Sequence, residues 1–126
     1  MRRAPTIDAM LAAAEAALAG TAPDDRHALG TVVLHILALH SRVLRALDLV
    51  PNVVGDDVPW VHLGRRDDWV ASVSGAIGHQ RRRVTELADL RDPSGLLAAC
   101  WAAFRTLRVV TQEMHDFLPP APRHAA

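Results

Sequence analysis

The feature that most constrains the fold is a helical spacing of apolar side chains that recurs in four separate segments. The first segment runs from Ile7 to Ala19, and the next three end near Leu49, near Leu90 and before Pro119. Apolar residues recur every three to four positions in each segment, and this spacing gathers them on one face of a helix. No segment alternates apolar and polar residues as a half-buried strand does. The sequence therefore predicts an all-α protein with four amphipathic helices.

Capping residues and helix breakers mark where these helices should begin and end. Thr6 and Gly20 are expected to cap the first helix, and Asp24 is the expected N-cap of the second. Asp67 and Asp68 mark the start of the third helix. The chain breaks at Asp92, Pro93 and Ser94, and the fourth helix should begin near Gly95. The last three helices are of matched length, and most connections are short. This pattern predicts an antiparallel up-down-up-down four-helix bundle.

The bundle is expected to occupy residues 1–118 of the 126 as a single domain, followed by a disordered Pro- and Ala-rich tail at 119–126. One connection, Pro51–Arg66, is long for a compact bundle, and such loops are commonly functional or mobile. It carries Trp60 and His62. We expect this loop to act as a lid over a bound ligand, with a core-capping role for Trp60 as the alternative.

Charge and cysteine content indicate which partners the protein can bind and in which cellular compartment it is found. The 14 basic residues are all arginine and balance 14 acidic residues, so a net charge of zero argues against nucleic-acid binding. Cys100 is the one cysteine, which excludes an internal disulfide framework and fits a reducing compartment. Neither a convincing signal peptide nor a run of about 18 apolar residues is evident. We therefore expect a cytoplasmic protein with no membrane partner.

Several polar side chains fall on or beside the buried faces of the expected helices. The helical period places His40, Gln80 and Thr111 among apolar neighbours, with His35 and His115 at the edges of the stripes. A buried polar group without a hydrogen bond costs about 1–3 kcal/mol, so these groups need partners. Two interpretations remain open, a hydrogen-bonded polar cluster in the core or a pocket for a small molecule or metal ion.

In the pocket interpretation, histidines supply acid–base chemistry and their neighbours hold the ligand. The expected catalytic residues are His115 and His40. The expected ligand-binding residues are Gln80, Thr111, Arg108, Trp60 and His62. The pocket should lie between the second and fourth helices, at the end covered by the Pro51–Arg66 loop. Whether His35 or His40 faces it depends on the axial offset of the two helices, which remains open.

The stretch ALGTVVLHILALHSRVLRAL and the segment TQEMHDF carry a family resemblance. They resemble the DinB/YfiT-like four-helix bundles, and in particular the N-terminal domain of mycothiol-dependent maleylpyruvate isomerases. The resemblance implies a divalent metal ion, zinc or nickel, held by His35 and His115, and a low-molecular-weight thiol as co-substrate. Thr111 stands where the family has a further ligand, so the triad is incomplete. A third ligand would have to come from His40, Gln80 or Glu113.

Two functions compete at this point. The first is a small DinB-like enzyme whose His-lined pocket supports thiol-dependent transfer, isomerisation or a tailoring step on a secondary metabolite, in keeping with an Arg- and Ala-rich composition that resembles actinobacterial proteins. The second is a non-catalytic module that binds a small molecule or pairs as a homodimer. Leu34 and Val109 support the second function, because both lie away from the buried stripes and are free to cover a partner.

Overall fold

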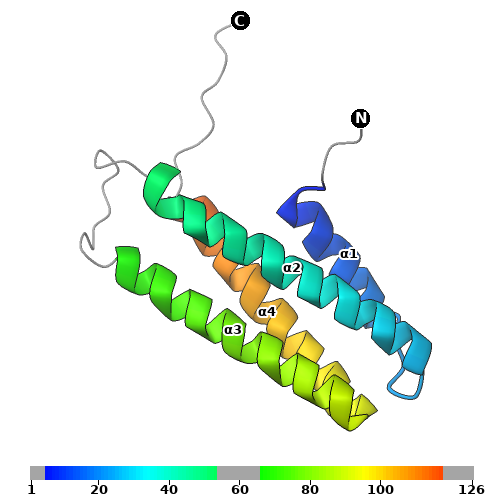
Figure 1. Cartoon of the computed structure of the whole chain (residues 1–126). Coiled ribbons are helices and arrows are strands. Elements are labelled where there is room, and N and C mark those ends of the chain that lie inside the picture. The colour runs from blue at the N-terminus through cyan, green and yellow to red at the C-terminus, as the bar shows by residue number, and fades with distance from the viewer. Residues whose placement is uncertain (1–4, 54–65, 118–126) are drawn as a thin grey trace, which may run out of the picture.

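The computed structural model describes residues 5–53 and 66–117 of the chain. Four helices make up these ranges: α1 (Ile7–Ala19), α2 (Arg26–Val53), α3 (Arg66–Leu90) and α4 (Pro93–Phe117). They run alternately up and down along a common axis, and the described ranges contain no strand (Figure 1). The prediction of an all-α, antiparallel four-helix bundle is confirmed. Trp60, His62 and the expected tail at 119–126 lie outside the described residues.

The start of α2 corrects one capping prediction. Thr6 and Gly20 cap α1 as expected, with the Ala9 N–H donating to Thr6 Oγ1 at 3.1 Å. At α2, however, the cap is Asp25, whose Oδ1 accepts from the Ala28 N–H at 3.0 Å. Asp24 is too far from that group because an N-cap side chain reaches the amide three residues on. The expectation that Asp24 caps the helix is wrong by one residue.

The break before α4 is itself the start of that helix. Asp92 Oδ1 accepts from the Gly95 N–H at 3.0 Å, so Asp92 is the N-cap and Pro93 the first helical residue. Proline suits this position because its missing N–H would have no partner there in any case. The helix begins two residues earlier than predicted. At the other end of the bundle, α2 continues through Pro51 to Val53 instead of stopping near Leu49.

The four helices do not contribute equally to the bundle. α2 and α4 run parallel to each other and are in contact, whereas α1 and α3 each pack on both of them and make no contact with one another in the described ranges. The central pair is therefore α2 and α4, with α1 on one side and α3 on the other. Because α1 has 13 residues and α2 has 28, α1 covers less than half of the length of α2.

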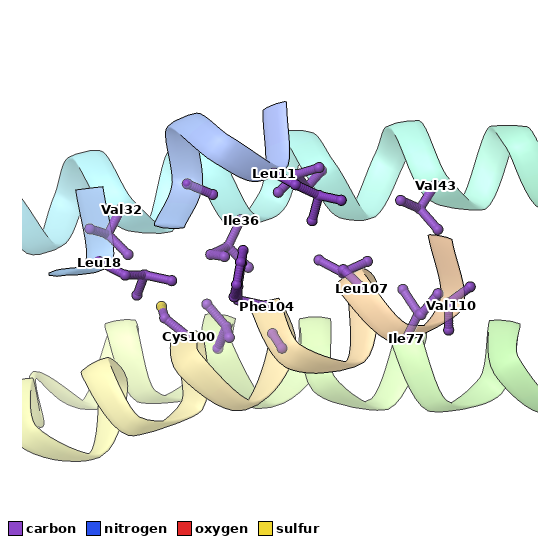
Figure 2. Packing of buried hydrophobic residues seen from close by; sticks show 14 of the residues in the cluster. Leu11, Leu18, Val32, Ile36, Val43, Ile77, Cys100, Phe104, Leu107 and Val110 are labelled. Carbon is purple, nitrogen blue, oxygen red and sulfur yellow. The ribbon is translucent and has the colours of Figure 1, made fainter. Parts of the chain in front are cut away.

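The core is continuous along the central pair and fixes the axial register. Figure 2 places Ile36 of α2 at the level of Phe104 of α4, and Val43 close to the level of Val110. These residues belong to one buried apolar cluster with side chains from all four helices. The register of α2 against α4, which the sequence leaves open, is thereby defined.

α2 is long and apolar enough to cross a membrane by length and composition. Within the 23 residues of Arg26–Asp48, an 18-residue window reaches a mean hydropathy of 1.3, although histidine and arginine residues interrupt its apolar run. Core helices of bundles share these properties with membrane spans. In this bundle α2 contacts each of the other three helices, so it serves as the central core helix.

Candidate functional site

His40 and Gln80 lie in the same layer of the bundle. Figure 2 shows Val43 and Ile77 at one level in the core. His40 lies three residues before Val43 on α2, and Gln80 lies three residues after Ile77 on α3, which runs in the opposite direction. Both residues therefore lie about one helical turn from that pair, towards the amino end of α2.

This layer is short of hydrogen-bond partners. His40 is fully buried, as predicted, but neither ring nitrogen has a hydrogen-bond partner among the described residues, so the prediction of a bonded ring is wrong. Gln80 is half-buried, and its Nε2 donates to Thr106 Oγ1 at 2.8 Å while its Oε1 has no described partner. Leu107, a buried core residue of α4, offers no polar side-chain atom to either group.

The surroundings of His40 make it a poor acid–base catalyst near neutral pH. Burial lowers the pKa of His40 to about 4, and the positive charge of Arg81 on α3 adds to this effect. The ring is therefore neutral at pH 7 and a weaker base than an ordinary histidine. Because its exposed fraction is 0%, a substrate cannot reach it in this conformation. A catalytic role for His40 stays a prediction.

Thr111 and Arg108 have protein partners of their own. Thr111 is buried, and its Oγ1 donates to the Leu107 carbonyl oxygen one turn earlier at 2.7 Å. Arg108 is exposed, and its guanidinium lies 5.3 Å from the centre of the Phe104 ring, within the range of a cation–π contact. Both polar groups thus have partners within the protein and need no ligand to pair with. The expected ligand-binding roles of Thr111 and Arg108 stay predictions.

The structure does not bring together the two histidines that the family resemblance implies as metal ligands. Half-buried His35 directly precedes Ile36, which lies at the level of Phe104, whereas exposed His115 follows Phe104 on α4 by about three helical turns. His115 Nε2 instead lies 3.5 Å from Asp8 Oδ1 on α1. No group of three histidine, cysteine or acidic side chains within residues 5–53 and 66–117 has the geometry of a metal site. The described donors thus do not fit a metal ion shared by His35 and His115.

Cys100 is a core residue. Its side chain is fully buried in the apolar cluster, beside Leu18 in Figure 2. Burial raises the pKa of the Cys100 thiol to about 11, so only a minute fraction is thiolate at neutral pH. Since the thiolate is the reactive form, Cys100 is unsuited to act as a nucleophile.

The start of α2, the end of α3 and the start of α4 meet at one end of the bundle (Figure 1). Residues from these three places line a groove. Its volume is about 300 Å³, at the lower end of the range for small-molecule sites. The lining includes buried leucines and exposed charged side chains, and its residues are Arg26, Leu29, Gly30, Val33, Ala88, Arg91, Asp92, Pro93 and Leu96. The groove is separated from His40, Thr111 and His115, so it is not the pocket expected from the sequence.

Two arginines from different segments flank this groove. Arg26 is the first residue of α2, and Arg91 lies in the turn between α3 and α4. Arg91 has φ 55°, a left-handed conformation that costs a residue other than glycine roughly 1–2 kcal/mol. The turn is held by hydrogen bonds from the Arg91 N–H to the Ala88 carbonyl at 3.3 Å and from the Asp92 N–H to the Leu87 carbonyl at 3.4 Å. A guanidinium is thus held at a position that glycine would occupy with less strain.

Comparison with known proteins gives no family for this chain. No protein-family model, no curated protein and no solved structure matches it.

The groove residues Arg26, Gly30 and Arg91 are not among the site residues predicted from the sequence. Two signals could have pointed to them. An up-down-up-down bundle necessarily brings the start of the second helix to the junction of the third and fourth, and each of these places carries an arginine. Gly30 has no side chain and lies beside the apolar face of α2. A glycine at such a position is typical of a helix that another segment approaches closely, or of an open groove.

Proposed function

We propose that this protein is a non-catalytic binding module that holds one small molecule in the groove between the amino end of α2 and the α3–α4 turn. The observation that carries the proposal is the composition of the groove, which combines buried leucines with two exposed arginines. Leu29 and Leu96 supply buried apolar surface, with 3% and 8% of their surface exposed. Concave, mostly apolar surface with a few polar groups at defined places is the usual form of a small-molecule site.

The positions of the titratable residues support binding over catalysis. The histidines that sequence analysis singled out are absent from the groove, and its lining residues include no histidine or cysteine. The one lining carboxylate, Asp92, already accepts the Gly95 N–H as a helix cap. The groove therefore offers positive charge and apolar surface but no free group suited to act as a general base or nucleophile.

Gly30 provides a direct test, because it lines the groove and has free space around it. A Cβ atom built at Gly30 meets nothing within 4 Å, so a larger side chain can enter the groove without displacing a neighbour. We expect Gly30→Phe to fold, since phenylalanine has the better helix propensity, and to lose binding of 1-octanol and octanoate followed by NMR titration.

The matched control is Gly75→Phe on α3. Gly75 also has nothing within 4 Å of a built Cβ, and it does not line the groove. We expect this variant to bind both probes like the wild type. Binding of neither probe by the wild type, or unchanged binding by Gly30→Phe, would show that the groove is not a ligand site.

A further inference from the structure

Resting on the proposed function, we infer that the groove selects an organic anion with an apolar body, such as a medium-chain carboxylate. Arg26 and Arg91 flank the same groove from two different segments of the chain. A guanidinium presents a planar set of N–H donors that matches the oxygens of a carboxylate. Two such groups over apolar surface suit a ligand that is charged at one end and apolar at the other.

The two guanidinium groups are available for a ligand. Neither Arg26 nor Arg91 forms an ion pair with a carboxylate in the described part of the chain. The nearest acidic residues along the chain are already engaged, since Asp25 accepts the Ala28 N–H and Asp92 accepts the Gly95 N–H, each at 3.0 Å. Among the residues that line the groove, two arginines stand against one carboxylate, Asp92, so positive charge exceeds negative charge there. Both α2 and α4 begin here, and the positive ends of their dipoles favour an anion, whereas the negative carboxyl end of α3 at the same groove opposes it.

Two strongly exposed leucines lie close along the chain to residues that line the groove. Leu34, four residues after Gly30 on α2, is 69% exposed, and Leu90, next to Arg91, is 73% exposed. Exposed leucines near a ligand site offer further apolar surface on which an aliphatic or aromatic body can lie. The volume of about 300 Å³ limits the buried part of the ligand to a small molecule.

Three probes of one shape and different charge test this selectivity: octanoate, 1-octanol and octylamine, the last a cation at pH 7. NMR titration at low salt should give affinities in the order octanoate, octanol, octylammonium, with roughly a 3- to 10-fold step from octanoate to octanol for partly exposed charges. Added salt should weaken octanoate binding and leave octanol binding unchanged.

Arginine variants assign the selectivity to the two guanidinium groups. Arg26→Gln and Arg91→Gly should each weaken octanoate binding several-fold without changing octanol binding. Arg91→Gly should also raise Tm, because glycine adopts φ 55° without strain, so weaker binding by this variant cannot result from poor folding. The control is Arg82→Gln, an exposed arginine on α3 outside the groove, which should behave as the wild type.

Two outcomes overturn the inference while leaving the proposed function in place. One is equal affinity for octanoate and octanol, both abolished by Gly30→Phe. The other is octanoate binding that Gly30→Phe abolishes but neither arginine variant weakens. Failure of the proposed function has a different signature, since in that case Gly30→Phe leaves the binding of every probe unchanged.

Discussion

Replacing His40 by leucine is expected to stabilise the protein and to remove much of its sensitivity to acid. The ring of His40 is fully buried and neither nitrogen has a described hydrogen-bond partner. Leucine has similar size and no polar group to bury. Relief of one unpaired buried group is worth about 1–3 kcal/mol at pH 7, so the free energy of unfolding of His40→Leu should rise by an amount in this range.

The pH dependence follows from the lowered pKa of His40. Its pKa is about 4 in the folded protein and about 6.5 in the unfolded chain, so between these values the unfolded state binds more protons. Titration of His40 therefore leaves the free energy of unfolding unchanged above about pH 6.5 and lowers it as the pH drops towards 4. The contribution of this one group to the fall is about 3 kcal/mol. His40→Leu should lack this part of the acid loss.

Urea denaturation from pH 7 to pH 4 measures both effects. His79→Gln is the matched control, because His79 is exposed on α3 and its removal should leave the wild-type acid profile intact. If His40→Leu instead loses stability at pH 7, then the imidazole makes favourable interactions in the folded protein. If it keeps the full acid profile, another group is responsible for it.

Phe104→Ala should cause the largest loss of stability of any change considered. The Phe104 ring is 1% exposed at the centre of the core, where α2 and α4 meet, and it packs edge-on against Trp101 with centroids 6.1 Å apart. Removal of a buried aromatic ring leaves a cavity and costs about 3–5 kcal/mol. Total stabilities of about 5–15 kcal/mol are usual for domains, so this loss is a large share.

The check is the midpoint of urea unfolding for Phe104→Ala beside that of Leu34→Ala. Leu34 is 69% exposed, so its truncation should change stability by no more than about 0.5 kcal/mol. A loss below about 1.5 kcal/mol for Phe104→Ala would mean that the centre of the bundle is loosely packed.

The helices themselves were predictable because local chemistry determines them. Thr6 and Gly20 mark α1 to the residue, since a hydroxyl cap and a glycine stop act on the nearest backbone groups. The errors are also local. Asp24 and Asp25 are equally good caps, and the pattern of α2 does not say which one lies next to the first helical turn. Pro93 reads as a breaker, although proline is also favoured as the first residue of a helix.

The candidate site was less predictable because it depends on tertiary register. The helical period places His40 and Thr111 inside correctly, since burial depends on the face of one helix at a time. Whether His35 meets His115 depends on how far α4 is shifted along α2, and side-chain packing across the interface decides this. The groove depends on where three helix ends meet. No single segment of sequence contains that information.

The most direct test of the central claim is a map of the octanoate-binding site on the wild-type protein at pH 7. Backbone amide chemical shifts followed through a saturating titration show which residues sense the ligand. A groove site predicts that the changes concentrate at the start of α2, around Gly30, and at the α3–α4 turn, around Arg91 and Leu96. Changes that concentrate instead around His40, Thr111 and His115 would contradict it, and would place the ligand site in the pocket between α2 and α4 that the sequence predicts.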